Sequence, residues 1–118
     1  MSDIKEMALK YQDYMVCMRR RFHQYPEISG KEFQTRDLLI HEIESMQVPY
    51  KMLKGTGIIA VIEGGKPGKH RVIRADIDGL GVLEEERNLK QKKVCVSRVE
   101  AYAMPVDTMP IWPCCWEL

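Results

Sequence analysis

Two carboxylates one residue apart are the clearest chemical feature of this chain. They are Asp76 and Asp78, and they close the β-branched stretch within residues 71–80. Side chains two residues apart on a strand point to the same face, so the sequence predicts that both carboxylates face one side. Gly79 then allows a sharp turn, and α/β enzymes commonly build their sites at the carboxyl ends of buried strands. An acidic site and two solvated acids at a strand end both fit this stretch.

Two helices are predicted ahead of these acids, over residues 3–24 and 30–46. Each starts with a capping box, in which a short polar side chain and a Glu three residues later satisfy free N–H groups. The two pairs are Asp3 with Glu6, and Ser29 with Glu32. Apolar residues recur at helical spacing and predict the core face of each helix. These are Ile4, Met7, Ala8, Tyr11, Tyr14, Met15, Met18 and Phe22 in the first helix, and Phe33, Leu39, Ile43 and Met46 in the second.

Three strands are predicted to follow, at residues 50–53, 58–63 and 71–76. Glycine-rich turns at residues 55–57 and 64–68 separate them. Strands joined by tight turns pair antiparallel, so the order helix, helix, strand, strand, strand predicts an α/β fold with a mixed sheet. A further strand-like run occupies residues 94–99.

Length and charge limit the function classes. The 118 residues suffice for one small domain, and a net charge of +1 favours neither a nucleic acid nor an anionic membrane as partner. The basic patch at residues 87–93 lacks interleaved aromatics, so a solvated loop is expected there. No apolar run could span a bilayer and the start lacks a signal-peptide layout, so a cytoplasmic protein is expected.

The four cysteines do not indicate a disulfide scaffold. Cys17 and Cys95 lie singly in periodic segments, where buried thiols are expected. Cys114 and Cys115 are adjacent, and neighbouring cysteines cannot easily share one metal or one disulfide. We therefore expect no zinc site there.

Three separated motifs carry a family resemblance. They are Arg19-Arg-Arg-Phe-His23 with Pro26-Glu27, Ser29, Glu32 and Thr35; Thr56-Gly57 with Ile62, Gly64 and Pro67-Gly68; and Arg74-Ala-Asp-Ile-Asp78-Gly-Leu followed by Glu84-Glu85. In combination they resemble the opening of the aminoacylase and carboxypeptidase-like metallo-amidohydrolases. The subgroup most similar contains hippurate hydrolases and indoleacetyl-amino-acid hydrolases.

The resemblance implies a truncated, partial three-layer mixed-sheet catalytic domain of a zinc-peptidase-like amidohydrolase over residues 1–100. The implied activity is metal-dependent hydrolysis of the amide bond of a small N-acyl amino acid or a peptide. It implies a divalent metal of the zinc or manganese class for the full-length family, but not one bound by this chain. Asp76, Asp78, Glu84 and Glu85 are the implied near-site residues, whereas His23 is expected to be structural.

The end of the chain departs from the family pattern. The family continues with His-Ala-Cys-Gly-His-Asp, which supplies a thiolate and an imidazole to the metal. Here residues 101–118 hold both tryptophans and half of the prolines, and they show neither helical nor strand periodicity. Gly81 also stands where the family usually has Pro.

A one-base shift of the reading frame accounts for this tail. Restoring one base before codon 101 permits Cys-His-Ala-Cys-Gly-His-Asp-Ala in the other frame. Several positions are forced by the genetic code: each Met-Pro or Trp-Pro pair must yield Ala, Cys114-Cys115-Trp116 must yield Leu twice, and Trp116-Glu117 must yield Gly. Each forced residue falls where the family pattern has it. Residues 101–118 are therefore predicted to be an out-of-frame tail, from a deletion or a sequencing error.

The chain by itself is expected to be marginally stable and without hydrolase activity. The lost motif would also begin the helix that covers the next face of the sheet, so apolar strands should keep one face exposed. A non-catalytic small α/β fragment or binding module, with no metal site, is the alternative that the sequence leaves open.

Overall fold

The first helix, α1, spans Ile4–Gln24 and confirms the expected helix. The computed structural model describes residues 3–82, 93 and 95–99. Asp3 is the N-cap, and its Oδ1 accepts a hydrogen bond from the Lys5 backbone N–H at 3.2 Å, as a short acidic side chain does at a helix start. Arg21 and His23 lie in the last turn, where positive charge suits the negative end of the helix dipole.

The second helix, α2, spans Phe33–Ser45 and begins later than predicted. The capping box of Ser29 with Glu32 is wrong, because Glu32 is the N-cap and its side chain makes no capping bond. The carboxylate of Glu27 takes this role, accepting from the backbone N–H groups of Gln34 at 3.2 Å and Thr35 at 2.6 Å. A carboxylate from outside the helix thus satisfies the free donors at its N-terminus.

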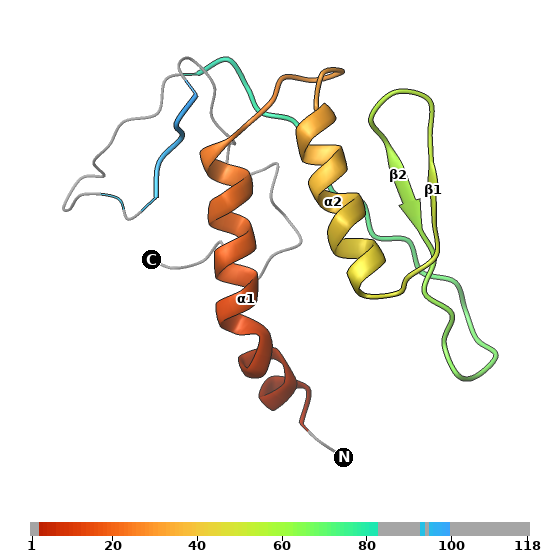
Figure 1. Ribbon diagram of the computed structural model, residues 1–118. Helices are drawn as coiled ribbons and strands as arrows, with labels where there is room; N and C mark the ends of the chain where they lie inside the picture. Colours follow the sequence, from red (N-terminus) through yellow and green to blue (C-terminus); the bar gives the residue numbers. More distant parts are fainter. Residues whose placement is uncertain (1–2, 83–92, 94, 100–118) are drawn as a thin grey trace.

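A β-hairpin follows, with β1 at Tyr50–Met52 and β2 at Ile58–Ala60. The strands pair antiparallel in the register Tyr50 with Ala60 and Met52 with Ile58. Gly55 turns the chain at φ 92°, a left-handed conformation that favours glycine. The expected strands at 50–53 and 58–63 are therefore confirmed as a hairpin, although both are shorter than predicted. The helices and hairpin make an α/β arrangement, as expected (Figure 1).

The predicted third strand at residues 71–76 is wrong. Residues 61–78 form neither helix nor strand, and Gly79 then forms an isolated parallel bridge with Ile28. A strand needs a neighbour to receive its backbone hydrogen bonds, and within the described residues the sheet ends at β2. The run predicted at 94–99 lies partly outside the described residues, and residues 95–99 form no strand.

The core lies between the two helices. Met18 and Phe22 are its buried members, and Leu38 and Leu39 of α2 pack against them. At about 1.5 Å per residue, 13-residue α2 is much shorter than 21-residue α1. The predicted apolar face of α1 is consequently buried only near its C-terminal end, while Ile4, Met7, Tyr11 and Tyr14 are exposed.

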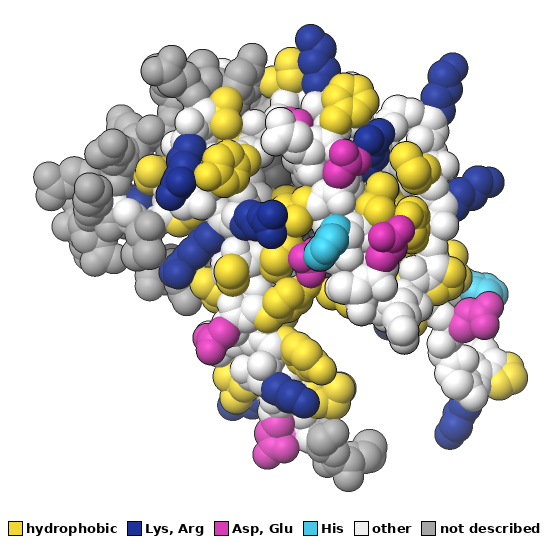
Figure 2. All heavy atoms as spheres, in the orientation of Figure 1, with side chains coloured by type: hydrophobic (Ala, Val, Ile, Leu, Met, Phe, Trp, Pro, Cys, Tyr) yellow, Lys and Arg dark blue, Asp and Glu magenta, His cyan; other side chains and the backbone are white. Residues whose placement is uncertain are grey.

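Apolar side chains reach the surface elsewhere too. Figure 2 shows hydrophobic groups scattered over the visible face of the molecule. Val72 and Ile73 of the missing third strand are 95% and 76% exposed, and Ile62 after β2 is 82% exposed. The expectation that residues 58–62 and 72–73 keep an apolar face exposed is confirmed. Neither described helix combines the length and apolar character that a bilayer crossing requires.

Candidate functional site

The predicted acidic residues lie where an irregular segment returns to the helices. Asp76 is exposed and its Oδ1 pairs with the Arg74 guanidinium at 2.9 Å. Asp78 is half-buried, and the next residue, Gly79, is buried. Because no strand forms at residues 71–76, the prediction that Asp76 and Asp78 share one strand face is wrong. Glu84 and Glu85, the other predicted site residues, lie outside the described residues, as do Cys114 and Cys115.

One backbone contact fixes the end of this segment. The Gly79 N–H donates to the Glu27 carbonyl oxygen at 2.6 Å, within the parallel bridge of Ile28 with Gly79. Three residues later the chain has already turned, since the Val82 N–H donates to the Leu80 carbonyl at 2.9 Å. Asp78 is therefore held next to an anchored residue, whereas Asp76 lies on the exposed side of that anchor.

Two glutamates form the polar framework around this anchor. Glu27 Oε1 accepts from the Thr35 hydroxyl at 2.7 Å, in addition to the backbone bonds at the start of α2. Buried Glu32 accepts from the Thr56 hydroxyl at 2.7 Å and so ties the start of α2 to the hairpin turn. Sequence reasoning missed both roles. The sequence holds a sign of these roles in the spacing of Glu27, Glu32 and Thr35. That spacing predicts a family motif, and Glu32 also belongs to the predicted capping box.

The charge state of Glu32 follows from these bonds. Burial raises its pKa, but the hydrogen bonds from Thr56 and from the backbone N–H groups of Glu32 and Gly30 outweigh it, so the pKa is lowered from 4.5. Glu32 is thus an ionised, hydrogen-bonded structural residue at neutral pH.

The structure also places three other residues singled out in the sequence, His23, Cys95 and Cys17. His23 is half-buried in the last turn of α1. Cys95 is half-buried, and its thiol donates to the Arg20 carbonyl at 3.5 Å. Cys17 is exposed, so its predicted burial is wrong, because it lies on the surface of α1 that lines an open hollow.

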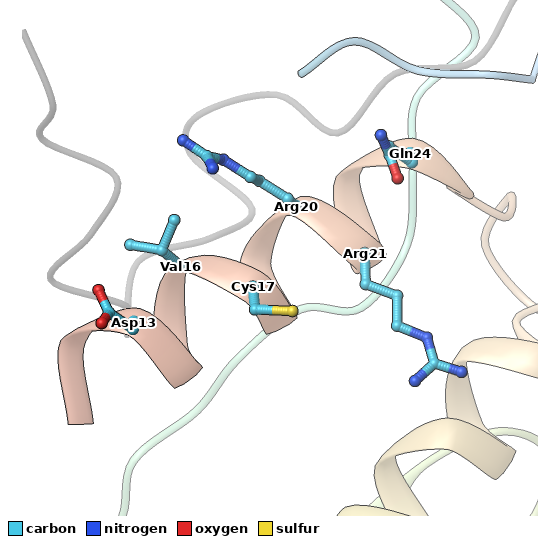
Figure 3. Close-up of a pocket in the computed structure, with 6 residues that line it drawn as sticks. All are labelled: Asp13, Val16, Cys17, Arg20, Arg21 and Gln24. Carbon is cyan, nitrogen blue, oxygen red and sulfur yellow. The ribbon is translucent and has the colours of Figure 1, made fainter. Parts of the chain in front are cut away.

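A hollow of about 470 Å³ lies beside α1. The described residues that line it all come from α1, and Figure 3 shows Arg20 and Arg21 pointing to different sides of the helix. The lining residues are Asp13, Val16, Cys17, Arg20, Arg21 and Gln24. Neither predicted aspartate is among these described residues, and side chains along one helix surface do not converge on one point as a catalytic site requires.

The described residues do not fit a complete metal site. Among them, no group of three or more His, Cys, Asp or Glu side chains is placed to hold an ion. Catalytic zinc in proteins takes three protein ligands, and Asp76 and Asp78 supply at most two carboxylates. The described part of the chain therefore offers at most one side of such a site.

Comparisons with known proteins relate this arrangement to a family. No family model matches the chain. It is 42% identical over 89 residues to the N-acetyldiaminopimelate deacetylase of Enterococcus faecalis, covering 74% of this chain and 24% of that one. It is 36% identical over 93 residues to thermostable carboxypeptidase 1 of Saccharolobus solfataricus, covering 77% and 22%.

A solved structure gives the same relationship at the level of the fold. The YXEP protein of Bacillus subtilis is a dinuclear metal-binding peptidase of the M20 family, and it superimposes with a TM-score of 0.68 at 29% identity. The match covers 80% of this chain and 26% of that protein. The chain spans about a quarter of the length of the relatives it matches. By sequence and by fold, the chain is thus similar to one segment, about a quarter, of amidohydrolases and peptidases such as these.

Proposed function

We propose that the whole protein to which this segment belongs hydrolyses the amide bond of a small N-acyl amino acid or a peptide. The observation that carries the proposal is the 42% identity over 89 residues to a deacetylase of an N-acetylated amino acid. The likeness to a carboxypeptidase and to a metal-binding peptidase supports the same bond type. A divalent metal of the zinc or manganese class would polarise the amide carbonyl and acidify a water.

Within that protein, Asp76, Asp78, Glu84 and Glu85 are the proposed near-site residues. The anchoring of Gly79 supports this for Asp78, because a carboxylate beside a buried, hydrogen-bonded glycine has a defined position. The remaining metal ligands and the general base would come from parts of the protein that are not present in this chain.

The 118-residue chain alone is proposed to be inactive, with residues 1–100 as the amidohydrolase portion and 101–118 as the out-of-frame tail. The forced codon positions support this division. The aligned lengths of 89 and 93 residues also fall short of the full 118. A cytoplasmic location is proposed from the sequence.

The decisive experiment compares two proteins. The genomic DNA spanning codon 101 is sequenced, and the chain with its frame restored is expressed beside the 118-residue chain. Hydrolysis of an N-acetyl amino acid is measured with Zn²⁺, with Mn²⁺ and with a chelator. We expect metal-dependent activity only after restoration. A downstream frame that does not continue as an amidohydrolase, or an inactive restored protein, contradicts the proposal.

The role of Asp78 is tested in the restored protein. Asp78→Asn should lower kcat/KM by at least about a hundredfold if the carboxylate acts at the site, a loss typical of positioned catalytic groups. Glu63→Gln is the matched control, since Glu63 is an exposed acid in the same irregular segment. Equal activity of the two variants would exclude Asp78 from the site.

A non-catalytic binding module is the second candidate. The exposed apolar side chains of Val72 and Ile73 favour it, because contiguous apolar surface is typical of interaction sites. Calorimetric titration with Zn²⁺ separates the two functions. Tight binding by the frame-restored protein favours the amidohydrolase, and its absence in both proteins favours the module.

A further inference from the structure

We infer that Glu27 is the positioning residue for Asp78. The inference rests on the proposed function in one respect, namely that Asp78 acts at a site. Glu27 makes contacts in two directions. Its side chain bonds to the start of α2, and its backbone carbonyl accepts the Gly79 N–H at 2.6 Å. One residue thus connects the helix to the segment that carries the acid.

The side chain of Glu27 has little freedom. Oε1 accepts from both the backbone N–H and the hydroxyl of Thr35, at 2.6 and 2.7 Å, and Oε2 accepts from the Gln34 N–H at 3.2 Å. Thr35 itself is only 6% exposed. Bonds from neutral donors to a carboxylate are stronger than neutral pairs, and those at a helix N-terminus also gain from the helix dipole. Glu27 is therefore fixed to α2 rather than to solvent.

The backbone on either side of Glu27 is restricted as well. Pro26 is buried, and its ring fixes its own φ. On the other side, the Lys31 N–H donates to the Ile28 carbonyl at 3.0 Å, and Gly30 makes the turn with φ 82°. These restraints leave the Glu27 carbonyl aimed at Gly79. The side-chain bonds and the carbonyl bond are consequently parts of one junction.

The junction determines where Asp78 lies. Gly79 follows Asp78 directly, is buried, and pairs in parallel with Ile28. The preceding residues 61–76 have no regular structure and are exposed, so they do not position the acid. Removing the Glu27 side chain should free its backbone, weaken the Gly79 bond and release Asp78 from its place.

The test measures the Gly79 amide in the 118-residue chain by NMR hydrogen exchange. Glu27→Ala should raise the exchange rate of Gly79 by about tenfold relative to that of Phe22, which reports the helix core. Glu27→Gln retains a carbonyl acceptor and should restore most of the protection. Thr35→Val, a milder change that removes one donor, should give an intermediate rate. Glu63→Ala, which removes an exposed carboxylate of the irregular segment, is the control and should change neither amide.

Two results would overturn the inference. One is an unchanged Gly79 exchange rate in Glu27→Ala. The other is an equal rise at Gly79 and Phe22, which would mean only a general loss of stability. If Glu27→Ala fails to fold, the exchange rates of Gly79 and Phe22 are compared in Thr35→Val and Glu27→Gln instead. A Gly79 rate that is unchanged in Thr35→Val would overturn the inference. The readout needs no catalysis, so its failure is separate from the failure of Asp78→Asn in the restored enzyme.

Discussion

The hydroxyl of Tyr14 on α1 donates a hydrogen bond of 2.6 Å to Glu42 on α2, which joins the two helices beyond their apolar contact. Burial, this bond and the negative charge of Glu42 raise the pKa of Tyr14 from 10.0 to about 12. The folded chain therefore holds this proton more tightly than the unfolded chain does. Its contribution to stability is complete below pH 10 and is lost as the pH rises to about 12.

Glu42→Gln should bring the ionisation of Tyr14 back toward its ordinary value, because the charge and the strong acceptor are both removed. Tyrosinate absorbance during an alkaline titration measures this. The absorbance step at about pH 12, assigned to Tyr14, should vanish in Tyr14→Phe. Tyr50 also has a raised pKa, chiefly through its hydrogen bond to Glu44. Glu44→Gln is therefore the control, and it should leave the Tyr14 step in place. A step that persists at about pH 12 in Glu42→Gln contradicts the assignment.

Thr56→Val should raise the pKa of Glu32, because it removes the hydroxyl that stabilises the buried carboxylate. Because the pKa of Glu32 is lower in the folded chain, its carboxylate stabilises the fold above about pH 4.5. This stabilisation is lost as the pH falls through the pKa of the folded state. The variant should therefore lose about 1–2 kcal/mol at neutral pH and less in acid. Denaturant unfolding at several pH values measures it, with the Glu32 carboxyl shift followed by NMR. Thr35→Val, which acts on Glu27, should leave the Glu32 titration unchanged.

Phe22→Ala should unfold the helix pair, whereas Phe33→Ala should not. Phe22 is buried against α2, and emptying a core site of this size costs about 3 kcal/mol or more. Phe33 is 50% exposed and lies 5.4 Å from the Arg36 guanidinium, a contact worth about 0.5 kcal/mol. Far-ultraviolet circular dichroism during thermal unfolding compares the two. Similar losses for both variants would mean that the core is not where the structure has it.

Gly55→Ala should destabilise the hairpin by about 1–2 kcal/mol, since φ 92° places a Cβ in an unfavourable conformation. Gly64→Ala is the matched control, because its φ is ordinary and no atom lies within 4 Å of the added Cβ. That variant should change stability by less than about 0.5 kcal/mol. Thermal unfolding of both variants measures the difference, and equal values would exclude backbone strain at Gly55.

The local elements were predictable because their signals are local. Asp3 followed by apolar residues at helical spacing defined the start of α1, and the glycines at 55 and 57 defined the hairpin turn. The start of α2 was not predictable in this way. Its cap is the side chain of Glu27, which lies six residues before the helix, whereas the local pattern of Ser29 and Glu32 predicts a different cap.

The candidate site was predictable only in part. Asp76 and Asp78 were found from their spacing, but the strand expected to carry them needs neighbours that the described residues do not provide. The fixing of Gly79 by Glu27 joins residues 52 positions apart, and no local pattern reports a contact of that kind. The role of Asp76 and Asp78 stays a prediction from family resemblance, whereas the strand that periodicity predicted for them is wrong.

Residues 61–76 form a long exposed connection between the Val61 bond to Pro49 and the Gly79 bond to Glu27. Lys69, Arg71 and Arg74 all lie in it, and none of them is followed by proline. Exposed, irregular backbone with basic residues is the preferred substrate of trypsin-like proteases. A cut there leaves both helices and the hairpin on one piece and Asp76 and Asp78 on the other. Proteolytic nicking therefore breaks the covalent link between the helices and the carboxylates without first unfolding the helices, and leaves the Gly79 bond to Glu27 as a contact between the two pieces.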